Sequence, residues 1–184
     1  GMNPPQYLEV LNFSDPYYPS RITSFEIRNR YGLEGCLRMR KFEDRGVKIA
    51  FVVTGSHLGV FDFSQPLTPD VKKIINLSGK LMDIIEYNRG NEKYIVISLG
   101  KSGVIIYDVT DILNPYFVST YEDGRTMGRF VRTEDILYVI ADDGIDIISL
   151  SDISSPSSIT FFTPPHSYPK CITLEGRFLY TGGM

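Results

Sequence analysis

The sequence predicts an all-β fold, a β-propeller of four-stranded blades, on two observations. The first is a motif that occurs four times: an apolar stretch, then Ser or Thr, then usually Asp, and a loop that ends on proline. The copies end at Pro19, Pro69, Pro115 and Pro156, so they are 50, 46 and 41 residues apart (69 − 19, 115 − 69 and 156 − 115). A near-regular period in this range is typical of repeat proteins, and propeller blades of four strands have similar periods. The second observation is that short β-branched and aromatic stretches alternate with turn residues along the whole chain.

The first half of the chain is predicted to contain eight strands. Residues 1–6 are a polar, proline-stiffened leader. The expected strands are Tyr7–Phe13, Ile22–Ile27, Cys36–Phe42, Val47–Thr54, Leu58–Phe63, Val71–Leu77, Leu81–Tyr87 and Lys93–Leu99. Val47–Thr54 is apolar enough to be buried on both faces. Leu81–Tyr87 fits a helix by its pattern alone, but the position within the repeat predicts a strand there.

The second half repeats the plan more clearly. The expected strands are Val104–Val109, Phe117–Tyr121, Met127–Arg132, Ile136–Ala141, Ile145–Leu150, Ile159–Phe162, Lys170–Leu174 and Phe178–Thr181. A glycine opens or precedes the apolar strand of several copies (Gly59, Gly103, Gly144), where the backbone turns tightly. We therefore expect one propeller domain over residues 1–184, with repeat units at about 7–54, 58–99, 103–141 and 144–184.

The strand count leaves two ways to complete the ring. Taken in order, the strands form one pair, three sets of four and a final pair. These make about four whole blades if the N-terminal pair completes the C-terminal pair, which would remove open sheet edges. The alternative is a piece of a ring of six to eight blades, whose two unpaired edges another chain would have to meet.

Composition excludes several classes of protein. The chain has 184 residues, 42% hydrophobic and 22% charged, as expected for a folded domain with a substantial core. A net charge of −3 argues against a nucleic-acid surface, and no apolar run approaches the roughly 20 residues of a membrane span. Cys36 and Cys171 match no zinc pattern, so we expect two small buried hydrophobic residues, with a disulfide as the alternative.

The clearest copy of the motif resembles a known family. Val104-Ile-Ile-Tyr-Asp-Val-Thr-Asp, with Asn114-Pro115 closing the loop, is similar to the LVIVD repeat. Leu150-Ser151-Asp152 with Ser155-Pro156 is similar too, whereas Phe63-Ser64-Gln65 departs by carrying Gln for Asp. The resemblance implies a β-propeller, often in exported or displayed proteins, which points to an extracellular or cell-surface location. It implies no shared catalytic residues.

The acidic residues of the motif have two interpretations. Asp15, Asp108, Asp111 and Asp152 recur at fixed places. Carboxylates could bind calcium, but the same side chains also cap turns by accepting hydrogen bonds from nearby N–H groups. Recurrence in each unit favours the turn interpretation. Asp142 and Asp143 are the best single candidates for a cation site, although a turn is favoured there as well.

One set of charges is predicted to share an opening. Arg38, Asp83, Arg129 and Lys170 occupy comparable places on the strands expected to be innermost in each blade. Innermost strands face the central channel, so three cations and one anion would favour an acidic ligand. The alternative is a set of salt-bridged or solvated charges without a specific ligand.

The remaining candidates are histidines and an aromatic loop. His57 and His166 are too few for a three-histidine zinc site, and Ser56 beside His57 is expected to point away from it. Tyr17 and Tyr18, in the loop Asp15-Pro16-Tyr17-Tyr18-Pro19, could form a recognition surface or pack on a neighbouring blade.

These observations favour a non-enzymatic interaction or scaffold module that binds a protein or glycan through propeller loops. One alternative is a hydrolase or lyase with its site at the channel mouth. The other is an architectural segment of a larger surface protein. We expect no cofactor and no bound metal, and a homodimer is compatible with the open-edge alternative.

Overall fold

The computed structural model describes residues 7–27, 36–44, 46–165 and 168–183, and its described part contains sixteen strands. Their bounds are β1 Tyr7–Asn12, β2 Ser20–Glu26, β3 Cys36–Asp44, β4 Val47–Thr54, β5 His57–Asp62, β6 Asp70–Asn76, β7 Asp83–Arg89, β8 Glu92–Ser98, β9 Val104–Asp108, β10 Tyr116–Tyr121, β11 Met127–Thr133, β12 Ile136–Ala141, β13 Gly144–Ser149, β14 Ser157–Phe162, β15 Pro169–Glu175 and β16 Phe178–Gly183. All predicted strands are confirmed, including the helix-compatible segment that becomes β7.

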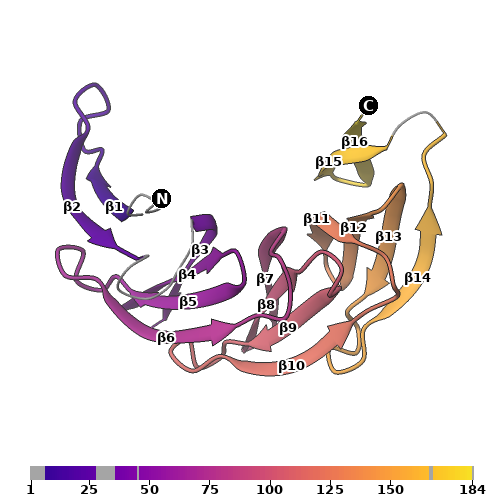
Figure 1. Cartoon of the computed structure of the whole chain (residues 1–184), viewed down its shortest axis with the longest axis horizontal. Coiled ribbons are helices and arrows are strands. Elements are labelled where there is room, and N and C mark those ends of the chain that lie inside the picture. Colours follow the sequence, from indigo (N-terminus) through magenta and orange to yellow (C-terminus); the bar gives the residue numbers. More distant parts are fainter. Residues whose placement is uncertain (1–6, 28–35, 45, 166–167, 184) are drawn as a thin grey trace, which may run out of the picture. The chain divides into compact units, whose positions relative to one another are not determined.

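The strands form antiparallel sheets in the predicted grouping of two, four, four, four and two (Figure 1). The four-stranded sheets are β3–β6, β7–β10 and β11–β14, while β1–β2 and β15–β16 are two-stranded sheets. The chain divides into two compact units, residues 1–77 and 78–184, and each is described by itself. Closure of the ring by pairing of the terminal strands stays a prediction. Over the described residues, no helix is long and apolar enough to cross a membrane.

The repeat extends to the register of each motif hairpin. In all four copies the strand before the motif pairs with the strand after it, and one residue of the second strand is skipped as a β-bulge. The skipped residues are Ile22, Lys72, Val118 and Ile159. A bulge adds local twist at the outer edge of a sheet. Equivalent positions in different blades can therefore be assigned residue by residue.

The acidic and amide residues of the motif hold its turn together. Seven residues before the proline, the side chains of Asn12, Asp62 and Asp108 accept the N–H of the motif Ser or Thr at 2.7 to 2.8 Å. Four residues before the proline, Asp111 and Asp152 accept an N–H two residues on, at 3.1 and 3.0 Å. Asp15 does the same at 2.9 Å. The turn interpretation of these residues is confirmed, because one side-chain oxygen of each accepts a local backbone N–H.

The motif also ties the second strand of each blade to the third. The N–H of the apolar residue in the motif donates to a carbonyl at the start of the second strand, at 2.7 Å in all three complete sheets. These donor and acceptor pairs are Phe63 with Lys48, Val109 with Lys93, and Leu150 with Asp135. In two sheets the motif hydroxyl accepts the N–H of the same strand-two residue, Lys48 to Ser64 at 3.0 Å and Lys93 to Thr110 at 3.1 Å.

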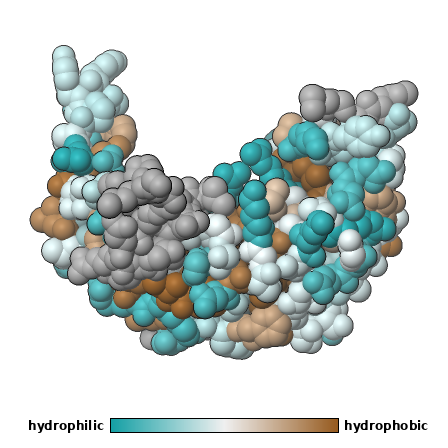
Figure 2. All heavy atoms as spheres, viewed as in Figure 1, coloured by the Kyte–Doolittle hydropathy of each residue, from teal (hydrophilic) through white to brown (hydrophobic). Residues whose placement is uncertain are grey.

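Each unit has its own core. In the second unit, apolar residues of β7–β10 pack against those of β11–β14, and Val96, Ile106, Leu137, Val139 and Ile148 are fully buried. In the first unit, Leu8 of β1 packs with Ala50, Val52 and Phe61. Hydrophobic residues also reach the surface in patches among hydrophilic ones (Figure 2).

The prediction of buried cysteines is wrong for Cys171, which is exposed and free on β15. Its thiol lies 3.5 Å from the carbonyl oxygen of Gly182 on β16. The reason is that, among the described residues, the main neighbours of β15 outside its own hairpin are β11 and β12 of the preceding sheet, so a side chain turned away from that sheet is exposed.

Candidate functional site

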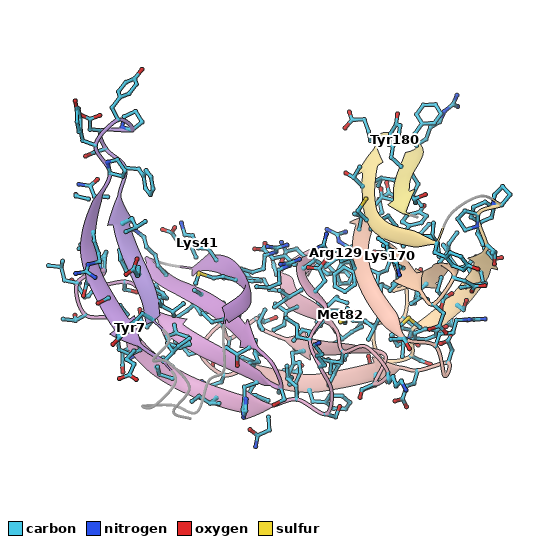
Figure 3. All side chains as sticks on the ribbon, turned by 45° about the horizontal axis from the view of Figure 1, so that its top comes forward. Tyr7, Lys41, Met82, Arg129, Lys170 and Tyr180 are labelled. Carbon is cyan, nitrogen blue, oxygen red and sulfur yellow. The ribbon has the colours of Figure 1, made fainter. Side chains whose placement is uncertain are left out.

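The second unit contains a pocket with a volume of about 440 Å³, built where the first strands of three successive blades begin. It is lined by Met82, Thr126, Met127, Gly128, Arg129, Ile140, Asp142, Pro169 and Lys170. We call it the inner-strand pocket. Figure 3 shows Arg129 on β11 and Lys170 on β15 close to each other, with Met82 nearby.

Backbone contacts fix the apolar floor of this pocket. The N–H of Met82 donates to the carbonyl of Ser98 at 2.8 Å, and the hydroxyl of Ser98 donates to the carbonyl of Met127 at 3.0 Å. The N–H of Met127 in turn donates to Gly100 O at 2.9 Å. Ser98 is fully buried. One buried serine therefore links the starts of β7 and β11 and holds both methionines in place.

The rim of the pocket depends on the turn between β12 and β13. Asp142 has a φ of 48°, the left-handed region that Asp tolerates better than most residues. Its N–H donates to the carbonyl of Thr126 at 3.3 Å, and its carboxylate accepts the N–H of Thr126 at 3.2 Å. This reciprocal pair places Thr126 and Asp142 together at one side of the pocket.

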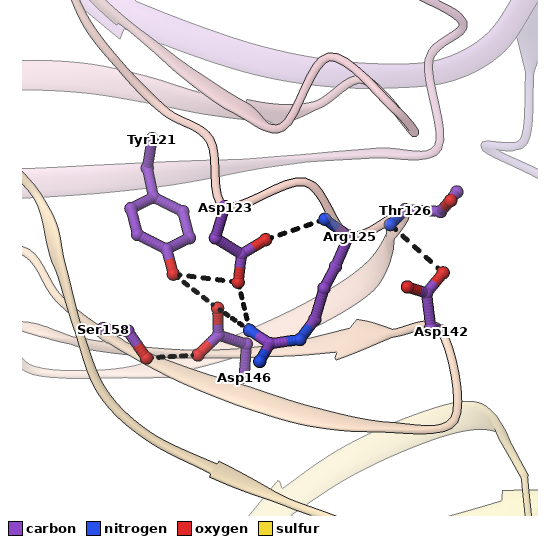
Figure 4. A network of polar contacts seen from close by, with 7 residues as sticks. All are labelled: Tyr121, Asp123, Arg125, Thr126, Asp142, Asp146 and Ser158. Carbon is purple, nitrogen blue, oxygen red and sulfur yellow. Dashed lines mark hydrogen bonds and ion pairs between the residues drawn. The ribbon is translucent and has the colours of Figure 1, made fainter.

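A network of polar side chains supports the loop that leads into the rim (Figure 4). At its centre is Asp146 of β13, which is fully buried. It accepts the hydroxyl of Tyr121 at 2.7 Å and that of Ser158 at 2.6 Å, and it lies 3.9 Å from the guanidinium of Arg125. Arg125 also bonds Asp123 and lies 4.1 Å over the ring of Phe161. The network anchors the β10–β11 loop to β13 and β14.

The network also changes the acidity of two members. Burial opposes ionisation of Asp123, but the N–H and guanidinium of Arg125 outweigh it and hold the pKa of the carboxyl below its usual value. Burial and the hydrogen bond to Asp146 raise the pKa of Tyr121. Tyr121 therefore remains a neutral hydroxyl donor over the ordinary pH range, which suits a structural bond.

The structure brings together two of the four predicted channel residues. Arg129 and Lys170 both line the inner-strand pocket. Asp83 follows the pocket residue Met82, but it is 8% exposed and its carboxylate accepts the N–H of Ile84 at 3.0 Å. Arg38 lies on β3 of the first unit. The four-charge opening therefore stays a prediction, and the second unit alone supplies a pair of cations.

The other candidates fall at separate places. Asp142 and Asp143 are exposed in the β12–β13 turn, and over the described residues no three His, Cys, Asp or Glu side chains cluster as metal ligands. Tyr17 and Tyr18 are 86% and 80% exposed at the tip of the β1–β2 hairpin. The described residues of the first unit thus do not pack over them, and a recognition role stays a prediction.

The histidines need one correction. Ser56 was expected to point away from His57, but its hydroxyl oxygen lies 3.4 Å from Nδ1 of the histidine. The reason is that Gly55 and Ser56 form the turn between β4 and β5, so the chain is not extended there. His166 lies outside the described residues.

The sequence pattern does not indicate most of the pocket wall or the network at Asp146. Met82, Ile140 and Pro169 belong to three different blades, so no local pattern joins them. Asp146 had a recognisable signal, because it is a carboxylate inside the apolar strand Gly144–Ser149. A buried carboxylate requires partners, so a carboxylate inside an apolar strand is a signal for such a network.

Comparison with solved structures supports the architecture. The chain resembles the WD40 domain of SCAP from fission yeast, with a TM-score of 0.58, 17% identity, 91% of this chain and 40% of that chain. The complex structure of the fission yeast SREBP–SCAP binding domains matches with a TM-score of 0.54 and 18% identity, over 85% of this chain and 44% of that chain. A Lactobacillus plantarum protein matches with a TM-score of 0.69 and 9% identity, over 96% of this chain and 57% of that chain. The computationally designed protein Ika4 matches with a TM-score of 0.55 and 12% identity, over 82% of this chain and 89% of that chain.

These comparisons fix the fold and leave the family open. The chain spans 40% to 57% of the length of the natural neighbours. No protein-family model matches the chain, and no curated protein matches it. The similarity to the LVIVD repeat therefore stays a resemblance. The chain is an all-β protein of four-stranded antiparallel sheets in repeating, propeller-like blades.

Proposed function

We propose that this chain is a protein-binding module whose inner-strand pocket receives an acidic segment of a partner protein. The observation that carries the proposal is the pair of cations, Arg129 and Lys170, on neighbouring first strands above an apolar floor. Both side chains are exposed, so they can reach a ligand without first being released from a buried site.

The chemistry of the pocket fits a carboxylate next to an apolar side chain. Arg129 offers a planar fork for bidentate binding of a carboxylate, and Lys170 adds a second positive charge. Met82 and Met127 supply a polarisable apolar surface that adapts to different side-chain shapes. The carboxylate of Asp142 accepts the N–H of Thr126 at the rim, and there it disfavours ligands with negative charge at that side. A segment with one or two acidic residues flanked by an apolar residue meets these conditions.

The SCAP neighbour supports a binding role by analogy, because its complex shows a propeller-like fold used in binding domains. Propellers host unrelated functions, so the analogy alone decides nothing about this chain. The hydrolase alternative would require a nucleophile activated by a base. Among the described residues that line the pocket, Thr126 supplies the hydroxyl group that could serve as a nucleophile, and Asp142 supplies the carboxylate that could serve as a base. The Asp142 carboxylate accepts the backbone N–H of Thr126.

The proposal is tested with a fluorescein-labelled peptide of alternating Glu and Leu residues and a matched peptide of alternating Gln and Leu. We expect the acidic peptide to bind and the neutral peptide to bind at least about tenfold more weakly, a difference of one carboxylate–cation contact. Arg129→Gln together with Lys170→Gln should abolish the difference between the peptides.

The matched control is Lys101→Gln, which removes one positive charge from an exposed turn of the same unit and leaves the pocket lining intact. It should leave acidic-peptide binding within about twofold of the unchanged protein, because Lys101 is exposed and does not line the pocket. Equal binding of both peptides, or equal loss in the control, would overturn the proposal.

A further inference from the structure

Two strands of this chain have hydrogen-bonding edges that the repeat elsewhere fills. In each complete sheet the second strand pairs with the third: β4 with β5, β8 with β9 and β12 with β13. By its place in the motif, β1 corresponds to the third strand of a blade. β16 corresponds to the second strand, because it follows β15 as β12 follows β11. Over the described residues, the two-stranded sheets contain only β1 with β2 and β15 with β16.

The hairpin β15–β16 copies the hairpin β11–β12. Both close with a two-residue turn whose first residue has positive φ, 46° at Glu134 and 57° at Gly176. Thr133 pairs with Ile136 across one turn, and Glu175 with Phe178 across the other. Residues 133–141 and 175–183 therefore correspond one to one, and β16 has the backbone geometry of a strand that accepts a third strand.

The same correspondence fixes a register between β16 and β1. Leu137 pairs with Ile148 in the complete sheet, and these positions correspond to Leu179 and Leu11. Leu150 donates its N–H to the carbonyl of Asp135 at 2.7 Å, and the equivalent donor and acceptor are Phe13 and Arg177. The edge of β1 thus presents the groups that β16 requires.

A groove lies beside β1 where a second strand would pack. It has a volume of about 330 Å³ within the first unit and is mostly apolar. It is lined by Leu8, Glu9, Val10, Met39, Lys41, Lys48, Ile49, Ala50, Phe63 and Pro66. Leu8, Glu9 and Val10 belong to β1, and the remaining strand residues belong to the first two strands of the next blade, β3 and β4. Such a groove is the space between adjacent blades with two strands missing.

Exposure at equivalent positions shows what would fill it. Between the complete blades, Tyr94 and Val96 of β8 are 4% and 0% exposed. Their equivalents on β16, Phe178 and Tyr180, are 57% and 55% exposed (Figure 3 shows Tyr180).

The opposite wall of the groove shows the same pattern. Phe130 of β11 is 3% exposed, whereas its equivalent on β3, Met39, is 41% exposed. Both sides of one blade-to-blade contact are thus present in the chain, each exposed where the complete blades bury it.

Charge is complementary across the same contact. Between the complete blades, the guanidinium of Arg132 lies 5.1 Å over the ring of Tyr87, and Tyr87 donates to Asp135 at 2.7 Å. The equivalents of Arg132 and Asp135 are Lys41 and Lys48, both in the groove. The equivalent of Tyr87 is Glu175. A carboxylate would therefore meet Lys48 and Lys41, the second of which also pairs with Glu43 at 3.0 Å, where the complete blades place an aromatic ring beside one cation.

We propose that the β15–β16 hairpin of one copy adds to β1 of a second copy and places Phe178 and Tyr180 in the groove. A second copy is the occupant we infer, because its β15–β16 hairpin carries exposed apolar residues at the positions equivalent to those that fill this space between the complete blades. If two copies make this contact reciprocally, a two-fold axis relates them, and the third-strand position beside β16 and the second-strand position beside β1 are both filled. Each shared blade then contains β15 and β16 of one copy and β1 and β2 of the other.

The test uses single-cysteine proteins in a background with Cys36→Ser and Cys171→Ser. One protein carries Leu11→Cys and the other Leu179→Cys, and the two are mixed and oxidised. Directly paired Cα atoms lie within the 4.4–6.8 Å or so that a disulfide spans, whereas positions two residues out of register are about 7–8 Å apart. We expect a disulfide-linked species of twice the 20.9 kDa chain mass in the mixture. The control pair, Leu11→Cys with Thr181→Cys, should give little.

A second measurement separates the sources of pairing. One chain carrying both Leu11→Cys and Leu179→Cys should give linked dimers, with light scattering showing twice the chain mass before oxidation. A disulfide within a single monomer would overturn the choice of a second copy in favour of a ring closed by one chain. Free thiols in both experiments would overturn the pairing itself.

The charge contact gives an independent readout of the same interface. Lys41→Glu should raise the dimer dissociation constant about three- to tenfold, and adding Glu175→Lys should recover most of it, since the pair is then reversed. Because Arg129 and Lys170 do not take part, the outcome is independent of the peptide-binding proposal. No recovery in the double variant would contradict the predicted register.

Discussion

Replacing Asp146 with alanine should destabilise the second unit strongly, because it removes the centre of a buried network. The side chain is fully buried. It accepts hydroxyl groups at 2.7 and 2.6 Å and lies 3.9 Å from a guanidinium. The variant leaves Tyr121, Ser158 and Arg125 without this acceptor, in a space that alanine leaves partly empty.

The expected magnitude follows from these contacts. A hydrogen bond to a charged group contributes about 1.5–3 kcal/mol, so two such bonds amount to roughly 3–6 kcal/mol. The ion pair adds little to this, because the Arg125 side chain is 36% exposed and its guanidinium lies 3.9 Å from the carboxylate. We expect a loss near 4 kcal/mol in the free energy of unfolding, which lowers the urea midpoint by roughly 2 M at an m-value of about 2 kcal/mol/M.

The assay is urea unfolding followed by circular dichroism, since the chain has no tryptophan. The matched control is Asp143→Ala, an exposed carboxylate in the preceding turn that should change stability by no more than about 0.5 kcal/mol. Ser158→Ala removes one bond to Asp146, and Tyr121→Phe removes the hydroxyl that contacts both Asp146 and Asp123; both variants should fall between the two. An Asp146→Ala variant as stable as the Asp143→Ala control would refute the inference that the network supports the β10–β11 loop.

Three further predictions concern the backbone, the motif and the tyrosines. Gly103→Ala should lower the free energy of unfolding in urea by at least about 1–2 kcal/mol more than Gly90→Ala does. Both glycines have positive φ, but a Cβ at Gly103 would lie 2.1 Å from a β10 carbonyl oxygen, whereas a Cβ at Gly90 would meet no atom within 4 Å. Asp108→Ala should cost roughly 2–4 kcal/mol by the same assay, because its carboxylate accepts two hydrogen bonds, at 2.7 and 3.0 Å; a loss as small as for Asp108→Asn would contradict this. Burial raises the pKa of Tyr87 and Tyr94 to about 12, so their stabilisation is complete below about pH 10 and is lost as pH rises through their folded pKa. A spectrophotometric titration at 295 nm should show a late phase that coincides with unfolding, and a single phase near pH 10 would contradict the prediction.

The residues proposed to recognise partners lie outside the repeated core positions that build the fold. The pocket cations and the β1 groove lie at places where blades meet or where a blade is incomplete. Loops and incomplete edges of a repeat array carry its variable chemistry, because the repeated positions are committed to packing. For this reason we expect the choice of partner to depend on residues such as Phe178 and Lys41, and not on the recurring motif.

The sequence by itself determined the strands, their grouping into sheets and the role of the motif. Sixteen strands in sets of two, four, four, four and two follow from turn residues at a regular spacing. The bond from Asp108 to the N–H of Thr110 spans two residues, and contacts of this range depend on local sequence alone. The strand at Asp83–Arg89 was decided by its position in the repeat, where the hydrophobic pattern alone was ambiguous.

Only the tertiary structure decided which side chains meet. Arg129 and Lys170 share a pocket, while Asp83 is buried at the start of its strand, although the sequence pattern predicts comparable places for all three. By strand register Lys170 corresponds to Gly128, one residue before Arg129. Cys171 is exposed although cysteine usually packs as a small hydrophobic residue. Burial and charge pairing depend on which blade lies against each strand, and that neighbour lies 40 or more residues away in the sequence or, as we propose for β16, in a second copy of the chain.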